Sequence, residues 1–374
     1  MTSIFMVIGI VGWIALLTSI YVYKKAKDER LKSITIDDKE STDPNVVVIG
    51  GGTGQSVFLR GLKKRTRNIT AIVTVADDGG GSGVLREDLG MLPPGDIRNC
   101  LLALANIEPT MKEVMQYRFT EGALKGQSFG NLFLAAMNGL YGNFEVALYK
   151  MSQIFAITGK VLPVTLNDIN LIAKLKNGKI VKGESRIPKE VKDDKTYIER
   201  VYLDEQDAVP LDEVINSIEN ADIIIMGPGS LYTSIIPNLL VNGVVDAIEK
   251  SKAPKVYICN IMTQPGETDD HNVLDHVNAI VKHTNKNIID YVISNNEVLP
   301  KEMIDIYQKD GAKQVILDDK QRKILKTMGA KTIEENLIEI KNNYIRHDAG
   351  HISDIVINLA LRHDNDKEIG RAHV

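Results

Sequence analysis

Cysteine is scarce in this chain of 374 residues, and positive charge is not in excess. The two cysteines, Cys100 and Cys259, lie far apart within apolar runs, so we expect reduced core residues of a cytosolic domain rather than a disulfide or a metal site. Lys and Arg total 45 against 49 Asp and Glu, which gives a net charge of −4 and a pI near 6.0. Without a basic stripe to release counterions, the composition argues against a nucleic-acid partner.

Charge is missing altogether from residues 4–23, IFMVIGIVGWIALLTSIYVY, a run of 20 residues long enough to cross a bilayer as a helix. The alternative, a signal peptide, lacks a basic n-region beyond the amino terminus and a small-x-small cleavage site. The next segment, KKAKDERLK, is mainly basic and places the rest of the chain in the cytoplasm by the positive-inside rule. We therefore expect a single-pass anchor in the cytoplasmic membrane over residues 1–23 and a charged tether over residues 24–44.

The third glycine of the dinucleotide fingerprint is also missing, from NVVVIGGGTGQSVFLRGL at residues 45–62. Val46–Ile49 form an apolar run without alternation, which is typical of a strand buried on both faces of a parallel sheet. The turn at residues 50–54 has almost no side chains, and a helical pattern follows it. This arrangement brings backbone N–H groups and the positive end of a helix dipole close to an anion, so it predicts a phosphate or diphosphate site. The alternative is a tight turn without a ligand.

A second buried-strand run at residues 69–75 ends at Asp77 and Asp78 and continues into another glycine turn, DDGGGSG. Asp77 is 77 − 54 = 23 residues past Gly54, close to the offset at which a Rossmann acid meets a ribose hydroxyl. In the motif LPPGDIRN that follows, Asp96 is expected to cap a helix over residues 97–105, with Arg98 and Asn99 in its first turn. These side chains either face a phosphate or base, or only close the helix terminus. Asp77, Asp78 and Asp96 either hold Mg²⁺ beside a diphosphate or accept hydrogen bonds from ribose and turn N–H groups.

The rest of the chain repeats a strand, loop and helix rhythm. We expect a helix over residues 211–221 and a third glycine turn, GPGSLYTSIIPNLL, at 227–240. The expected strands cover residues 222–226, 255–259, 288–294 and 314–317, and a last amphipathic helix follows Arg346. Residues 161–202 differ, because alternating runs flank Asn177-Gly178, a strong hairpin signal.

The predicted fold is therefore α/β, a three-layer α/β/α Rossmann-like parallel sheet with an antiparallel hairpin insert. The nucleotide-binding domain covers residues 45–362, and a tail covers 363–374. The last seven residues, EIGRAHV, match an in-frame reading of a common sequencing adapter and are left out of fold reasoning. Because every glycine loop follows a strand, we expect all of them at one edge of the sheet, around one cleft. No Ser/His/Asp set and no nucleophile elbow stands out.

Seven motifs in order give the region from Val46 to Leu361 a resemblance to a bacterial family, the gluconeogenesis factors, relatives of 2-phospho-L-lactate transferase with its CofD-like fold. They are VIGGGTGQSVFLRGLK, ITAIVTVADDGGGSG, LPPGDIRN, FGNLFLAAM, GPGSLYTSIIPNLL, NIMTQPGET and RHD. The resemblance implies a site for a UDP-sugar such as UDP-N-acetylglucosamine. It also implies a role in cell shape and cell-wall synthesis on gluconeogenic carbon sources, with cell-wall synthesis proteins as partners.

The candidate ligand-binding residues come from these motifs. They are Gly51, Gly52, Thr53, Gly54, Asp77, Asp78, Gly79, Gly80, Ser82, Asp96, Arg98, Asn99, Asn131, Gly227, Pro228, Gly229, Ser230, Thr233, Asn260, Gln264, Glu267, His271 and Arg346. His271 stands where the family commonly has a tyrosine that can stack on the ligand. No residues are assigned to a resident metal.

Three functions remain open from the sequence. The first is a membrane-tethered sensor that binds a UDP-sugar without turning it over. The second is a transferase that moves a phospho-acyl or sugar group from a nucleotide donor with Mg²⁺. The third is an NAD(P)-binding oxidoreductase, against which the missing third glycine argues. The sequence leaves the oligomeric state open, a homo-oligomer included.

Overall fold

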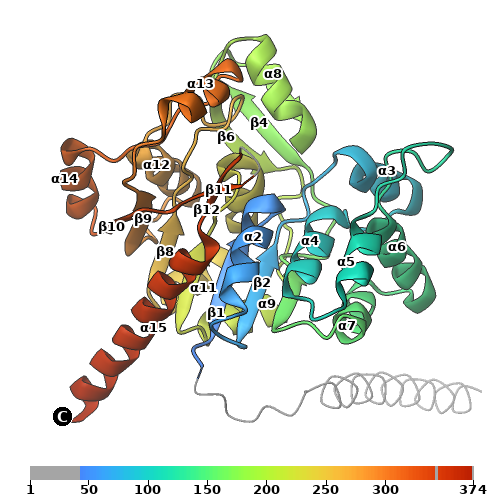
Figure 1. The fold of residues 1–374 in the computed structure, drawn as a ribbon, viewed down its shortest axis with the longest axis horizontal. Coiled ribbons are helices and arrows are strands. Elements are labelled where there is room, and N and C mark those ends of the chain that lie inside the picture. The colour runs from blue at the N-terminus through green and yellow to red at the C-terminus, as the bar shows by residue number, and fades with distance from the viewer. Residues whose placement is uncertain (1–42, 342–343, 373–374) are drawn as a thin grey trace, which may run out of the picture. The chain divides into compact units, whose positions relative to one another are not determined.

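The computed structural model describes residues 43–341 and 344–372, and side chains up to residue 363 (Figure 1). Residues from Asp43 onward form one compact unit. The predicted membrane anchor and most of the tether lie outside the described residues. Within the described part, no single helix has the length and apolarity to cross a membrane, although Leu231–Leu239 and Val244–Lys250, taken together as a bent pair, do.

Seven strands of the described chain form one parallel sheet, in the order β10-β9-β8-β7-β1-β2-β3. Every residue of β1 is buried, as expected for the central strand of a sheet covered on both faces. The strands are β1 (Val46–Gly50), β2 (Ile69–Val73), β3 (Lys160–Pro163), β7 (Ile223–Met226), β8 (Lys255–Ile258), β9 (Tyr291–Asn295) and β10 (Lys331–Glu335).

The direction of winding reverses between β1 and β7. From β1 the chain moves outward through β2 to β3, and it then returns to the other side of β1 and continues from β7 to β10. Residues of β1 pair with β2 and β7 at once, so that Val48 lies opposite both Ala71 and Ile225. Open parallel sheets bind ligands at such a reversal, outside the carboxyl ends of the strands.

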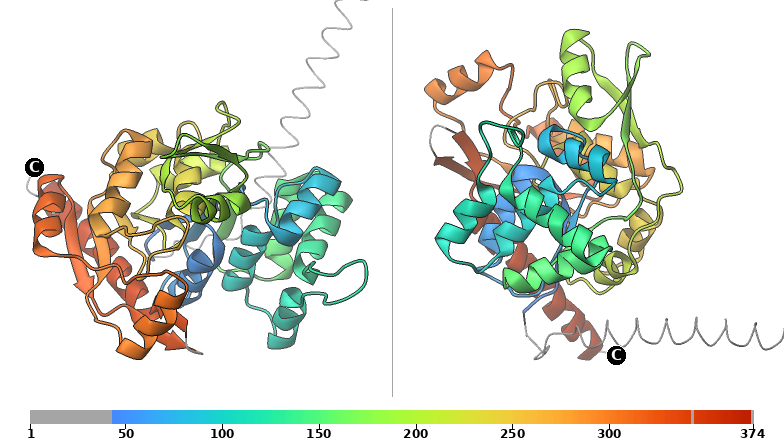
Figure 2. Two further views of the ribbon diagram at one scale, coloured as in Figure 1. Left: turned by 90° about the horizontal axis from the view of Figure 1, so that it is seen from above. Right: turned by 90° about the vertical axis from the view of Figure 1, so that its right-hand side faces the viewer.

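Two groups of helices cover the sheet, consistent with right-handed crossovers that run in opposite directions from β1. Helix α2 packs between α4 and α15 (Figure 1), whereas α9 to α12 contact one another as a second group. Figure 2 shows α3 to α7 gathered on one side of the sheet, away from α13 to α15. The bounds are α2 (Gly52–Leu62), α3 (Gly80–Leu89), α4 (Gly95–Leu104), α5 (Pro109–Gln116), α6 (Phe129–Tyr141), α7 (Phe144–Ile154), α8 (Ile187–Asp193), α9 (Asp212–Glu219), α10 (Ile236–Leu239), α11 (Val244–Lys250), α12 (Val273–Thr284), α13 (Lys301–Lys309), α14 (Asp319–Thr327) and α15 (Ala349–Ala372), with a 3₁₀ turn η1 (Glu184–Arg186) and a π turn η2 (Leu231–Ile235).

The predicted hairpin insert is confirmed as a separate antiparallel sheet of β4 (Leu171–Leu175), β5 (Ile180–Lys182) and β6 (Ile198–Leu203). Gly178 takes the left-handed conformation at φ 87°, and Asn177 Oδ1 accepts from Lys179 N at 3.1 Å, as the Asn-Gly signal predicts. The insert begins later than residue 161, because residues 160–163 form edge strand β3 of the main sheet.

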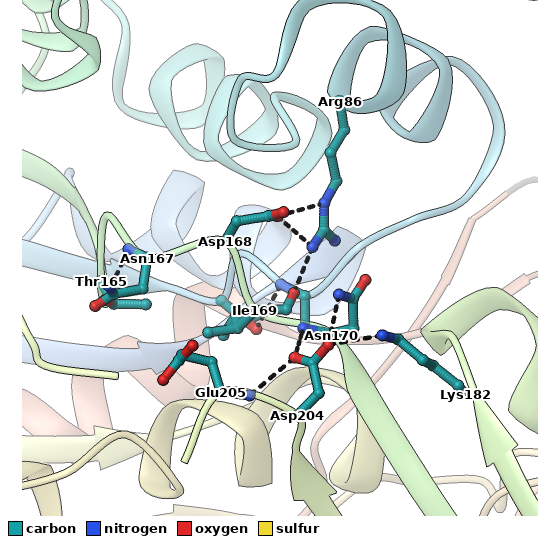
Figure 3. Close-up of polar contacts among 11 residues, drawn as sticks. Arg86, Thr165, Asn167, Asp168, Ile169, Asn170, Lys182, Asp204 and Glu205 are labelled. Atoms are coloured by element: carbon teal, nitrogen blue, oxygen red, sulfur yellow. Dashed lines mark hydrogen bonds and ion pairs between the residues drawn. The ribbon is translucent and has the colours of Figure 1, made fainter. Parts of the chain in front are cut away.

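Arg86 of α3 ties the insert to the main domain (Figure 3). Its buried guanidinium donates from Nε to Asp168 Oδ1 at 2.8 Å and from Nη2 to the Ile169 carbonyl at 2.7 Å. Asp204 at the end of β6 accepts from Asn170 N at 2.6 Å and pairs with Lys182 at 2.8 Å. Burial opposes ionisation of Asp204, but these partners hold its pKa down at about 2.

Near the carboxyl end, one expected strand is wrong and two features were missed. Residues 314–317 form no strand, since only Gln314 pairs, in an isolated bridge with Met262, while Val315 and Leu317 are buried as core residues of a loop. The final strand of the sheet is β10, whose polar sequence KTIEE carries no buried-strand signal. A hairpin of β11 (Ile338–Lys341) and β12 (Tyr344–His347), absent from the sequence expectations, then precedes α15.

Candidate functional site

The first and third glycine turns lie against each other at the reversal between β1 and β7. A Cβ atom added at Gly54 would lie 2.8 Å from the Pro228 carbonyl oxygen, and one added at Gly229 would lie 3.3 Å from the Gly51 oxygen. Side chains at these positions would force the two turns apart. Helix α2 begins at Gly52, and its N-cap residue Gly51 has no side chain, so the N–H groups of the first turn lie at the edge where the turns meet.

Two carboxylates, Asp77 of the second glycine loop and Asp96 of α4, lie at the same edge. A Cβ atom at Gly51 would lie 2.8 Å from Asp96 Oδ2, and one at Gly95 would lie 3.2 Å from Asp77 Oδ2. Burial raises the pKa of Asp77, and it raises that of Asp96 to about 6 with a further contribution from Asp77. The expectation that Asp96 caps its helix is wrong, because α4 already begins at Gly95 and the Asp96 carboxylate accepts from the Gly52 N–H.

Glu184 joins this acidic group from the insert, and sequence reasoning missed it. Burial raises its pKa to about 8, helped by the charges of Asp77 and Glu267. The 3₁₀ turn that carries Glu184 is held over the second loop by a 2.8 Å hydrogen bond from Ser185 N to Asp78 Oδ1. The only local signal was a glycine, Gly183, which takes φ +105° beside the Asp78 carboxylate.

The loop after β8 forms hydrogen bonds with the third glycine turn. This closeness was predicted, because both loops follow strands of the same sheet. Asn260 Nδ2 donates to the Gly229 carbonyl at 3.0 Å, and Ser230 Oγ donates to Gln264 Oε1 at 2.7 Å. Glu267 is buried and accepts from Thr233 Oγ1 at 3.1 Å, while its Oε2 has no hydrogen-bond partner. Burial raises the pKa of Glu267 to about 7.

No set of three or more His, Cys, Asp or Glu residues in the described chain is arranged to hold a metal ion. Asp78 already accepts from the backbone of the insert, and Asp77 Oδ1 accepts from Gly79 N at 2.9 Å. A Mg²⁺ ion at this edge would therefore need the phosphate oxygens of a ligand to complete its coordination.

His271 is engaged by the protein itself. Its Nε2 lies 3.1 Å from the Tyr232 hydroxyl, and its Nδ1 lies 3.1 Å from the Asp269 carbonyl oxygen. Its ring also packs edge-to-face against Tyr232 and His276, with centroids 5.9 and 5.6 Å apart. Both ring nitrogens therefore have partners within the protein. Unlike an aromatic ring without such contacts, His271 is not free to stack on a ligand.

Arg98, Asn99 and Asn131 form a group of their own between α4 and α6. Arg98 donates to the Ser128 hydroxyl and, at 2.7 Å, to Asn99 Oδ1. Asn131 N donates to the same hydroxyl at 3.3 Å, and its buried Oδ1 has no partner. These contacts link the two helices, and Arg98 reaches the glycine turns only through its charge, which acts on Asp96.

Arg346 is brought to the first glycine turn from the far end of the sequence. A pocket of about 250 Å³ lies between α2 and β12, lined by residues 53, 54, 57 and 344–347. His347 supports this wall, since its Nε2 lies 3.1 Å from the Cys259 carbonyl oxygen. A larger hollow of about 460 Å³ lies at the opposite edge of the sheet, around Asn220 and Ser251, and contains none of the candidate residues.

Comparison with known proteins agrees with this architecture. The family model described as 2-phospho-L-lactate transferase CofD matches residues 46–338. The chain belongs to the CofD family. A relative from Thermoanaerobacterium thermosulfurigenes is 61% identical over 316 residues, which are 84% of this chain and 97% of that protein.

Two further proteins are similar to this chain: one has a name, and the other has a solved structure. The protein named gluconeogenesis factor in Bacillus subtilis is 45% identical over 84% of this chain and 98% of its own length. The crystal structure of protein BH3568 from Bacillus halodurans superimposes with a TM-score of 0.81, at 45% identity, over 84% of this chain and all of that one. The resemblance found in the sequence motifs is thus confirmed at the level of family and fold.

Proposed function

We propose that this CofD family member is a gluconeogenesis factor that binds a UDP-sugar, with UDP-N-acetylglucosamine as the reference ligand, and acts as a sensor without turnover. The observation that carries the proposal is the contact of two glycine turns where the sheet reverses, beside the start of α2, whose N-cap residue is a glycine. Backbone N–H groups and a helix dipole at one edge suit a diphosphate. The pocket that continues from Gly54 to Arg346 offers space for part of the rest of the molecule.

Calorimetry on the full-length chain with UDP-N-acetylglucosamine, UDP-glucose and NAD⁺ tests this proposal. We expect the UDP-sugars to bind and NAD⁺ not to bind, with the titration repeated in Mg²⁺ and in EDTA to show whether a cation takes part. Replacing Arg346 by Gln should weaken binding about tenfold, because one charge-assisted hydrogen bond is lost. Arg67→Gln is the matched control, an exposed arginine before β2. Absence of binding by every UDP-sugar would refute the proposal.

A second candidate function, a CofD-like transferase, is favoured by one observation. Glu184 carries a carboxyl with a pKa of about 8 beside Asp77, at the edge where a diphosphate would lie. A group with that pKa is mainly protonated at neutral pH and can serve as a general acid, and as a base once it has given up its proton. Incubation of the protein with UDP-sugar or other nucleotide donors and phospho-acyl or sugar acceptors, with and without Mg²⁺, should yield a product that Glu184→Gln abolishes. If no mixture yields a product, the sensor function remains.

The cellular setting is part of the same proposal. Residues 4–23 would hold the domain at the cytoplasmic face of the membrane, next to cell-wall synthesis proteins, and the domain would act there alone or as a homo-oligomer. Deletion of the gene should then alter cell shape on gluconeogenic carbon and not on sugar. A chain without residues 1–23 that remains in the membrane fraction would contradict the anchor.

A further inference from the structure

An exposed aromatic side chain lines the pocket between α2 and β12. Tyr344, the first residue of β12, is 63% exposed and lines this pocket together with Thr53, Gly54 and Val57 of α2. β12 lies beside α2 (Figure 1). Among the described residues that line the pocket, Tyr344 is the only Phe, Tyr or Trp. An exposed aromatic ring on a pocket wall is available to pack against a flat ring of a ligand.

The side chain of Tyr344 has no partner in the described chain, whereas the strand that carries it is held in place. Neither its ring nor its hydroxyl forms a hydrogen bond or a ring pair with another described residue. The Tyr307 hydroxyl accepts from Ile345 N at 2.8 Å, and His347 Nε2 lies 3.1 Å from the Cys259 carbonyl oxygen. These contacts fix β12 directly after Tyr344 and leave the Tyr344 ring free for a ligand.

The pocket adjoins the proposed position of the diphosphate. Gly54 belongs to both places, because it lines the pocket and because a Cβ atom added to it would lie 2.8 Å from the Pro228 carbonyl oxygen of the third glycine turn. The volume of about 250 Å³ is below the roughly 300–1,000 Å³ of sites that enclose a drug-sized ligand. The pocket therefore has room for one ring of a UDP-sugar and not for the whole molecule.

The chemistry of the lining favours the base over the sugar as that ring. A hexose carries hydroxyl groups around its ring, and each of them needs a hydrogen-bond partner when it is buried. Val57, Ile345 and the ring of Tyr344 present mainly apolar surface, to which Thr53 and Arg346 add a hydroxyl and a guanidinium. Uracil has two flat faces that suit the apolar surface, and its carbonyl oxygens accept hydrogen bonds from a guanidinium.

We propose that Tyr344 stacks on the uracil ring of the bound nucleotide in this pocket, beside Arg346, which donates to a uracil carbonyl. Tyr344 and Arg346 are two residues apart in β12, so their side chains leave the same face of the strand. This inference rests on the proposed UDP-sugar function and names the residue that holds the base. Stacking on the base supplies affinity that does not depend on which sugar the nucleotide carries.

Calorimetry on the full-length chain with UDP and with 5,6-dihydro-UDP separates stacking from hydrogen bonding. The two ligands carry the same carbonyl and N–H groups, but the saturated base is neither planar nor aromatic. The variants are Tyr344→Leu, which removes the aromatic ring, and Tyr344→Phe, which keeps it. Tyr141→Leu is the matched control, because Tyr141 is an exposed tyrosine at the end of α6 that does not line this pocket.

We expect the wild type, Tyr344→Phe and Tyr141→Leu to bind UDP about tenfold more tightly than dihydro-UDP. Tyr344→Leu should bind UDP about tenfold more weakly than the wild type does, and it should bind the two ligands alike. Urea unfolding checks that each variant is folded, and Tyr344→Gln replaces Tyr344→Leu if the latter is not.

The inference is overturned if the preference for UDP survives without the ring of Tyr344, or if Tyr141→Leu loses the preference as well. It is also overturned if Tyr344→Leu weakens binding of UDP-N-acetylglucosamine and leaves that of UDP unchanged, which would place the ring against the sugar. A wild type that binds neither UDP nor a UDP-sugar would refute the proposed function, and this inference with it. Binding by the wild type that Tyr344→Leu leaves unchanged would refute this inference alone.

Discussion

Replacing Glu184 by Gln should stabilise the protein at alkaline pH. The Glu184 carboxyl lies with Asp77 and Glu267 at the edge of the glycine turns, and its pKa is raised from 4.5 to about 8, first by burial and then by the two acidic neighbours. A carboxyl whose pKa is higher in the folded state costs no stability below pH 4.5, where it is protonated in both states. The cost grows as the pH rises toward 8 and is complete above it. Glutamine keeps the shape and stays neutral.

The size of the effect follows from the two pKa values. Their difference corresponds to at most about 5 kcal/mol, at ~1.4 kcal/mol per pKa unit. Glu184 is only half-buried, so solvent screens part of this free energy. We expect Glu184→Gln to unfold with a free energy about 1–2 kcal/mol above that of the wild type at pH 9, and with no gain at pH 4.

Urea unfolding of both proteins at pH 4, 7 and 9 measures this difference. Far-UV circular dichroism is the suitable signal, because the only tryptophan, Trp13, lies outside the described domain. Glu87→Gln, an exposed glutamate on α3, is the control and should change little at any pH. If Glu184→Gln raised the free energy of unfolding equally at pH 4 and pH 9, or lowered it at pH 9, the view that Glu184 is held among negative charges would be refuted.

Two further predictions concern the turns and the insert. Gly54→Ala should lower the free energy of unfolding by about 1–3 kcal/mol and weaken UDP-sugar binding, since its Cβ would lie 2.8 Å from the Pro228 oxygen. The control is Gly139→Ala in α6, where the added Cβ meets open space. Urea unfolding should show that this control raises the free energy of unfolding by about 0.5–1 kcal/mol. Asp168→Ala should cost about 1–3 kcal/mol, because the buried Arg86 loses its carboxylate. Hydrogen exchange should then speed up in β4 and β6 before it does in β1, and uniform protection would contradict the role given to Arg86.

The central part of the fold was predictable because its signals are local. Val46–Ile49 is a continuous apolar run that ends in glycines, and the structure places it as the fully buried β1. The Asn177-Gly178 pair fixes its hairpin through a left-handed glycine and a side-chain hydrogen bond two residues on. Each of these features depends on residues that are adjacent in sequence.

The missed features depend on contacts between distant residues. β10 is an edge strand with partly exposed residues, so it needs no apolar run, whereas Val315 and Leu317 are buried without forming a strand. Glu184 lies in a short 3₁₀ turn, more than a hundred residues after Asp77, and only the packing of the insert brings the two carboxyls together.

Amide resonances of the turn glycines test the account most directly. The full-length chain would be labelled with ¹⁵N at glycine only and titrated with UDP-N-acetylglucosamine. We predict saturable shifts at Gly52, Gly54 and Gly229, because these residues lie where the two turns meet at the start of α2, with the Gly52 N–H donating to Asp96 there. Binding that leaves these three amides unchanged and shifts other glycines instead would contradict the placement of the diphosphate, and with it the proposed site.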